Sequence, residues 1–159
     1  MHHAHVIIIH FPIALFITSG FLSLIGLFYR RGLFVEILFW QLIIGVLLAL
    51  ASIYTGLQEE VQMAVTNEMA DLMAIHKRNG YIMTGFFFVL TLWLALRKKN
   101  MKIREYASWM IFVVFGSFIV IYQALLGTQL MYPEGARINK TEKIYPAEIQ
   151  APQQDLSSF

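Results

Sequence analysis

Four long apolar stretches constrain the fold of this chain more than any other feature of its sequence. They are Val6 to Phe28, Leu33 to Ile53, Tyr81 to Leu96 and Tyr106 to Leu126. The third reaches the length of the others if it begins near Leu72. A helix needs about 20 mostly apolar residues to cross roughly 30 Å of hydrocarbon. Because 58% of the 159 residues are hydrophobic and only 14% are charged, the sequence predicts an integral membrane protein with four transmembrane helices.

The basic residues between these stretches predict how the helices are oriented. Arg30 and Arg31 follow the first stretch, and a second basic run between Arg97 and Arg104 follows the third. Positively charged loops stay in the cytoplasm, so both termini are expected on the outer, periplasmic side of a bacterial inner membrane. Both loops are short, which makes successive helices antiparallel. The predicted fold class is therefore all-α, an integral membrane up-down-up-down four-helix bundle.

The chain divides into an apolar and a polar part. Residues 1–132 contain all four stretches and are expected to form one four-helix transmembrane domain, whereas residues 133–159 are polar and contain prolines. We expect the polar part to be an extended C-terminal arm that becomes ordered only against a partner. No internal repeat is apparent from the residues. Helical spacing predicts an amphipathic segment before the third helix, formed by Val61, Val65, Met69, Leu72, Met73 and His76.

Composition excludes several classes of protein. The chain has no Cys, so it has no disulfide, no thiolate metal site and no covalently attached c-type haem, which needs a Cys-x-x-Cys-His run. The net charge of +2 and the placement of the basic residues give no nucleic-acid surface. No glycine-rich phosphate loop and no catalytic residue stands out. A non-catalytic electron carrier or accessory subunit therefore fits the sequence better than an enzyme.

Histidines lie close to two of the apolar stretches. Four of the five fall in MHHAHVIIIHFPIAL at the start of the chain, and the fifth is His76. An imidazole is costly to bury in hydrocarbon without a partner. His10 is twenty residues before Arg30 (30 − 10), and His76 is twenty-one before Arg97 (97 − 76). Both are therefore expected about 30 Å from the basic loops, at one depth near the outer face.

A b-type haem would account for two histidines at one depth on two helices. Bundle cytochromes hold this cofactor through two axial histidines, here His10 and His76 as ligands of the iron. The small residue one turn further along each helix would leave flat space for the porphyrin. The two basic residues after His76 would meet the haem propionates. The predicted cofactor-binding residues are His10, His76, Ala14, Gly80, Lys77 and Arg78.

Other interpretations of these residues remain open. Proline is well tolerated in the first helical turn, so Pro12 allows the first helix to begin near Phe11 and leaves His10 in a flanking turn. His10 would then be in water or bonded to a carbonyl, and another histidine could replace it as the ligand. Thioether and imidazole groups also suit copper(I). An alternative site for copper or zinc would use His5, Met69 and Met73.

Three stretches match a known pattern. His5 to Leu15 reads HVIIIHFPIAL, a run of small residues ends at Gly56, and Leu126 to Tyr132 reads LGTQLMY. Together with His76 these stretches resemble an uncharacterised bacterial membrane family, domain of unknown function two-two-three-one, over about residues 5–138. Val6 stands where that family usually has proline. The resemblance implies a four-helix membrane domain with His5, His10 and His76 at one membrane face, and it implies no particular activity.

These observations lead to one functional expectation and two alternatives. The chain is expected to be a membrane electron-transfer subunit that binds one b-type haem near the outer face. It would work within a larger respiratory or redox complex and exchange electrons with a periplasmic cytochrome or with quinol. The first alternative is a cofactor-free structural or assembly subunit, and the second is a membrane protein that handles copper or zinc.

Overall fold

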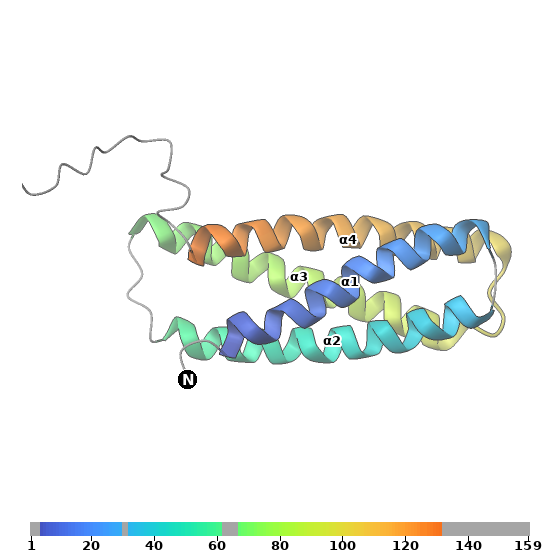
Figure 1. Cartoon of the computed structure of the whole chain (residues 1–159), viewed down its shortest axis with the longest axis horizontal. Coiled ribbons are helices and arrows are strands. Elements are labelled where there is room, and N and C mark those ends of the chain that lie inside the picture. Colours follow the sequence, from blue (N-terminus) through green and yellow to red (C-terminus); the bar gives the residue numbers. More distant parts are fainter. Residues whose placement is uncertain (1–3, 30–31, 62–66, 132–159) are drawn as a thin grey trace, which may run out of the picture.

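The computed structural model describes residues 4–29, 32–61 and 67–131, without the side chains of 67–69 and 131, and this part of the chain forms four helices. They are α1 (Ala4–Phe28), α2 (Gly32–Glu60), α3 (Asn67–Arg97) and α4 (Ile103–Met131). All four are long and apolar enough to cross a membrane. Figure 1 shows them as one elongated bundle in which successive helices run in opposite directions. The predicted all-α four-helix architecture is confirmed.

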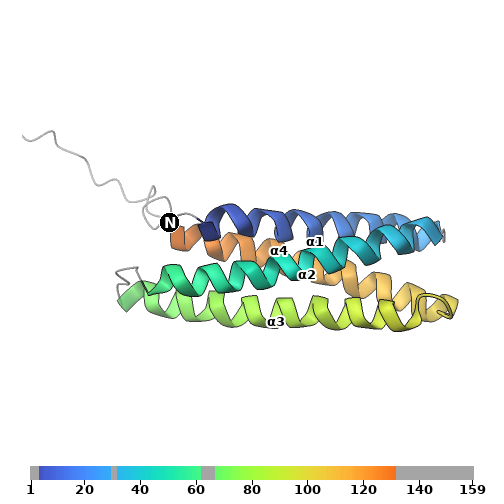
Figure 2. The ribbon, with the colours of Figure 1, turned by 90° about the horizontal axis from the view of Figure 1, so that it is seen from below.

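The four helices form a ring. α1 packs mainly against α2 and α4, and α3 packs mainly against the same two helices, so α1 and α3 are diagonal partners. The starts of α1 and α3 and the ends of α2 and α4 lie together at one end of the bundle (Figures 1 and 2). We call it the histidine end, because His5, His10 and His76 lie there. We call the opposite end the basic end, because it carries Arg97, Lys98, Lys99, Lys102 and Arg104.

Small residues let α1 approach α4 closely. Ser117 of α4 is buried, and its hydroxyl donates to the carbonyl oxygen of Phe16 at 2.7 Å. Gly20 of α1 lies against the same serine, and a Cβ added at Gly20 would overlap the Ser117 side chain. Helices in membranes associate through such close contacts, since hydrocarbon supplies no hydrophobic drive between them.

A stacked pair of phenylalanines fills the centre of the bundle. The rings of Phe16 from α1 and Phe87 from α3 are fully buried, their centroids are 3.9 Å apart, and their planes differ by 6°. Each ring lies against a glycine of a neighbouring helix, Phe16 against Gly45 and Phe87 against Gly116. The glycines leave the space that lets the two diagonal helices meet through their aromatic rings.

Helix boundaries differ from the sequence expectation at the histidine end. α1 begins at Ala4 and continues through Pro12, so His10 lies inside the helix and not in a turn before it. Proline removes one backbone donor from the helix, and the remaining bonds of a 25-residue helix hold it continuous. α3 begins at Asn67, so the later part of the expected amphipathic segment is the start of this helix. The predicted arm, residues 133–159, lies outside the described residues.

Candidate functional site

His5 is held in the first turn of α1 by residues near the end of α2. Its Nδ1 lies 2.8 Å from the carbonyl oxygen of Ser52, and its backbone N–H donates to Oε1 of Glu59 at 3.0 Å. The ring packs on Gly56, where an added Cβ would lie 3.0 Å from Cε1 of His5 and 3.1 Å from Nδ1. A larger residue at position 56 would therefore displace the imidazole.

The partner of His5 determines which of its ring nitrogens carries the proton. A backbone carbonyl only accepts hydrogen bonds, so the contact with Ser52 requires a proton on Nδ1. In the neutral ring, Nε2 of His5 then has a free lone pair. Histidines that bind metals generally have this arrangement, with the other ring nitrogen donating to a carbonyl or carboxylate.

His76 is held on α3 by residues near the end of α4. Gln123 donates from Nε2 to the carbonyl oxygen of His76 at 2.7 Å, and the same nitrogen lies 3.1 Å from Nδ1 of the His76 ring. The ring packs on Gly127, where an added Cβ would lie 3.2 Å from Cε1 of His76. Gln123 is buried, and its Oε1 has no hydrogen-bond partner in the described part of the chain.

The structure brings His5 and His76 together. Both are half-buried at the histidine end, and they are close enough for the charge of one imidazole to act on the other. They belong to the diagonal helices of the bundle. Each ring also lies on a glycine of a neighbouring helix, Gly56 or Gly127. The histidine end thus holds two half-buried imidazoles, each fixed by a hydrogen bond and a glycine.

His10 lies elsewhere. Its side chain is exposed on the outer surface of α1, and its Nδ1 contacts the carbonyl oxygen of Val6 one turn earlier. Ala14, one turn further on, is exposed as well. Five residues of helix separate His10 from His5, which places the two side chains about 140° apart around the axis. The predicted proximity of His10 to His76 is therefore not seen, since His5 takes that position.

The other predicted site residues lie near His76 in different environments. Lys77 forms an ion pair with Glu60 of α2, with Nζ 2.8 Å from both carboxylate oxygens. Arg78 is exposed. Gly80 is half-buried and faces Gln123, whose Nε2 would lie 3.6 Å from a Cβ added there. These positions keep Arg78 available to an anionic group, whereas Lys77 is already paired with a carboxylate.

The predicted copper or zinc site is only partly described. Met73 is half-buried on α3, three residues before His76, while the side chain of Met69 lies outside the described residues. Within residues 4–29, 32–61 and 67–131, no three His, Asp or Glu side chains are grouped so that they could hold a metal ion.

Of the residues that support the two histidines, the sequence marked Gly56 and Gly127 only through the family resemblance, and it did not place Ser52 or Gln123 at the site. Ser52 and Gly56 lie one turn apart on α2, and Gln123 and Gly127 lie one turn apart on α4. A glycine near the end of an apolar stretch is the signal common to both, because it leaves a helix face on which a flat ring can lie. The hydrogen-bond partner of His5 is a backbone carbonyl, which no residue type marks.

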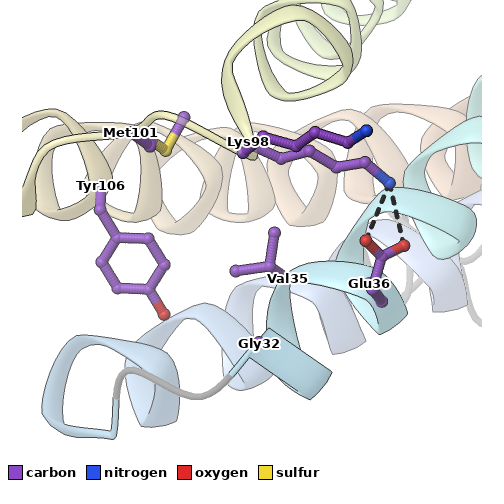
Figure 3. A pocket seen from close by; sticks show the side chains of 7 residues that line it. Gly32, Val35, Glu36, Lys98, Met101 and Tyr106 are labelled. Carbon is purple, nitrogen blue, oxygen red and sulfur yellow. Dashed lines mark hydrogen bonds and ion pairs between the residues drawn. The ribbon is translucent and has the colours of Figure 1, made fainter.

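A cavity at the basic end is separate from the histidines. It has a volume of about 270 Å³, and Lys98 reaches across it to Glu36 (Figure 3). The Lys98 Nζ lies 2.9 Å from both carboxylate oxygens and 3.9 Å from the ring centroid of Phe39. The ion pair joins the loop after α3 to α2. The lining residues are Gly32, Val35, Glu36, Lys98, Lys99, Met101 and Tyr106.

Comparison with known proteins identifies the family. The family described as "Predicted membrane protein (DUF2231)" matches residues 1–140, which include all four helices, His5 and His76. The chain belongs to this family. The resemblance in the sequence is thereby confirmed, and the four apolar helices are those of a membrane protein in contact with the lipid bilayer. Neither the curated proteins nor the solved structures give a match to the chain.

Proposed function

We propose that this chain is a membrane electron-transfer subunit that holds one b-type haem between His5 and His76. One observation carries the proposal: two half-buried imidazoles from diagonal helices lie at the same end of an apolar bundle, each seated on a glycine of a neighbouring helix. Bundle cytochromes bind haem non-covalently through such pairs of histidines. The geometry favours His5 over His10 as the ligand from α1, because His10 is on the outer surface.

The residues around the pair fit this cofactor. Gly56 and Gly127 make room for the two imidazole rings, which lie directly against them. The bond from His5 Nδ1 to the Ser52 carbonyl leaves Nε2 free to bind iron. The amide nitrogen of Gln123 lies 3.1 Å from Nδ1 of His76, and its buried Oε1 is an acceptor without a partner in the described residues. An unpaired buried acceptor is costly, so a partner there would stabilise the site.

The roles of the protein and of the cofactor are distinct. The bound iron would supply one-electron transfer, and the protein would position it and set its potential. His5 and His76 are proposed to ligate the metal, while Ser52 and Gln123 orient their rings. Glu59 holds the backbone of His5, and the ion pair of Lys77 with Glu60 joins α3 to α2 beside the site. Arg78 is the exposed cation proposed to meet a propionate.

The proposed position in the membrane follows from charge. Basic loops remain in the cytoplasm, which puts the basic end inside and the histidine end, with both termini, on the periplasmic side of the inner membrane. Electrons would then be exchanged with a periplasmic cytochrome or with quinol, within a larger redox complex. The polar arm, residues 133–159, would dock the other subunits.

The test is haem retention in matched variants. The full chain is expressed with ample haem, purified in detergent, and measured by reduced-minus-oxidised visible spectra and a pyridine haemochrome assay. We expect one b-type haem per chain in the wild type and in His10→Ala, and its loss in His5→Ala and His76→Ala. His10→Ala is the control because it removes an imidazole from the same helix without touching His5 or His76.

The other outcomes discriminate among the hypotheses. Loss of haem in His10→Ala together with retention in His5→Ala would restore His10 as the ligand and contradict the choice of His5. A colourless wild type would overturn the haem proposal. Copper or zinc in that colourless protein would favour metal handling, for which Met73, three residues before His76 on α3, is the supporting residue. A colourless, metal-free protein would favour a structural or assembly subunit.

A further inference from the structure

The two helical hairpins of the chain, α1–α2 and α3–α4, repeat one another at a constant offset of 71 residues. His76 follows His5 by this number (76 − 5), and Gly127 follows Gly56 by the same number (127 − 56). Between residues 4–60 and their counterparts, the offset pairs five identical residues. They are His5 with His76, Phe16 with Phe87, Gly45 with Gly116, Gly56 with Gly127, and Gln58 with Gln129.

Burial follows the same offset. The six buried positions of α2 correspond to six positions of α4 that are also buried. The pairs are Leu38 with Trp109, Leu42 with Val113, Gly45 with Gly116, Val46 with Ser117, Ala49 with Val120, and Ser52 with Gln123. These pairs of buried positions argue for an internal repeat, which was not expected from the residues alone. The two hairpins share few identical residues, because most interior positions are buried in both hairpins but are occupied by different residue types.

The repeat gives the bundle a pseudo-twofold axis along its length. α1 and α3 run in the same direction and are diagonal, so the axis passes between them. The stacked rings of Phe16 and Phe87, nearly parallel at 6°, are a pair of equivalent side chains meeting at this axis. His5 and His76 are the equivalent pair at the histidine end. A ligand held by both histidines would therefore sit on the axis.

One equivalent pair breaks the symmetry at this site. The counterpart of Ser52 is Gln123, and the two residues give their histidines opposite hydrogen bonds. The carbonyl of His76 only accepts, so the Gln123 atom 2.7 Å from it must be the amide nitrogen. The same amide nitrogen then donates to Nδ1 of His76. A neutral His76 therefore carries its proton on Nε2, whereas His5 carries its proton on Nδ1.

We propose that Gln123 is a positioning residue that sets the tautomer of His76 and makes the two halves of this twofold site inequivalent. Without a ligand, His5 presents a lone pair at Nε2 and His76 presents an N–H. A metal centre at His76 would need the lone pair of Nε2, so the ring would first have to carry its proton on Nδ1, the atom to which the Gln123 amide nitrogen donates. Gln123 would therefore oppose ligation by His76 as long as its amide keeps this contact and its bond to the His76 carbonyl. The inference rests on the proposed site.

The test reads the tautomers directly. The full chain is labelled with ¹⁵N in its histidine rings, prepared in detergent without haem, and measured by long-range ¹H–¹⁵N correlation. Signals are assigned by their loss in His5→Ala and His76→Ala. We expect the Nδ1–H form for His5 and the Nε2–H form for His76. An Nδ1–H form of His76 in this unloaded wild-type protein would overturn the inference without any further variant.

Matched variants separate positioning from folding. Gln123→Met keeps nearly the same volume but has no amide, and Ser52→Ala keeps the backbone carbonyl that His5 uses. Gln123→Met should abolish the preference of His76 for the Nε2–H form and leave the His5 signal unchanged, which shows that the histidine end still folds. Ser52→Ala should leave both signals unchanged. An unaltered His76 signal in Gln123→Met would contradict the inference.

The loaded protein supplies a second readout. Gln123 holds His76 in the form that has no lone pair on Nε2, so Gln123→Met should remove that restraint and lose haem to an acceptor protein more slowly than the wild type. Ser52→Ala should match the wild type, and an equal rate in the two variants would contradict the role of Gln123. A colourless wild type with the expected tautomers would overturn the proposed function alone. A haem-binding wild type with the wrong tautomers would overturn only this inference.

Discussion

The two halves of the bundle bury equivalent positions but fill them differently. α1 buries Ser19 and Ser23 where α3 buries Leu90 and Leu94. The small side chains let the backbone of α1 lie directly against α4, as the bond from Ser117 to the Phe16 carbonyl shows. α3 instead packs through large side chains. The residue type is kept where Phe16 and Phe87 meet at the axis and changes at these other buried positions, because several combinations of side chains fill the same volume.

Hydrogen bonds distinguish the halves as well. Tyr106 of α4 donates from its hydroxyl to the carbonyl oxygen of Gly26 at 2.9 Å, while its counterpart in α2 is Val35, which has no donor (106 − 71 = 35). Lys98 pairs with Glu36, and their counterparts, Leu27 and Ala107, are uncharged. The hydrogen bond of Tyr106 and the ion pair of Lys98 therefore have no equivalent at the positions related to them by the offset of 71 residues.

The largest loss of stability is expected from substitutions of Gly45 and Gly116, which test whether the two hairpins are equivalent at the pseudo-twofold axis. A Cβ at Gly45 would lie 2.7 Å from the Phe16 ring, and one at Gly116 would lie 2.8 Å from the Phe87 ring. Gly45→Leu and Gly116→Leu should each lower the free energy of unfolding by about 1–3 kcal/mol, since overpacking displaces the stacked rings. Unfolding of the detergent-solubilised protein in rising dodecyl sulfate measures this.

Gly85→Leu is the matched control for these two variants. Nothing lies within 4 Å of a Cβ added at Gly85, which is also a helical glycine of the bundle. Its unfolding should resemble that of the wild type or be slightly more difficult, since leucine favours the helix more than glycine does. Wild-type stability in one of the two axial variants would show that the halves are not equivalent there.

A smaller effect is expected from the tyrosine that exists in only one half. Tyr106→Phe removes the buried bond to the Gly26 carbonyl and should cost about 0.5–1.5 kcal/mol in the same unfolding experiment. Tyr122→Phe is the control, because Tyr122 is exposed on the outer surface of α4. An equal loss in both variants would mean that the bond to α1 contributes nothing specific.

The smallest effect is expected from the ion pair of Lys98 and Glu36. Half of the Glu36 side chain is exposed, at 53%, so solvent and salt screen the pair. Lys98→Met should lower stability by about 0.2–1 kcal/mol, and high salt should reduce the difference from the wild type. Lys99→Met removes the neighbouring lysine as a control. A difference that persists in high salt would assign the effect to packing of Lys98 on Phe39.

The misplacement of the α1 histidine has a definite cause. The sequence argument measured depth from Arg30 on the first helix and from Arg97 on the third. At the offset of the repeat, Arg97 corresponds to Gly26 and not to Arg30 (97 − 71 = 26). The two reference points therefore differ by about one helical turn. That error put His10 at the level of His76, whereas His5 is its true counterpart.

Other parts of the expectation needed no correction. Four membrane helices, their antiparallel order and the membership of a membrane family were all predictable, because each follows from the length and hydropathy of single segments. His76, Gly56 and the run near Gly127 were also singled out in the sequence. Gln123 was not assigned a role, since a single amide in an apolar stretch has several uses and only its contacts show which one applies.

The sequence by itself determined which segments cross the bilayer, and the tertiary structure decided which faces of those segments meet. Whether a segment crosses the bilayer depends on the summed free energy of transferring its side chains from water into hydrocarbon. Each segment's own residues determine this sum. The rotation of each helix depends on partners far away in the chain, such as Gly45 against Phe16 or Gly127 against His76. Lipid tails are as apolar as leucine, so the pattern of hydrophobic residues does not separate the inside of the bundle from its outside. Close packing at a few small residues makes that choice, and it places His5, not His10, opposite His76.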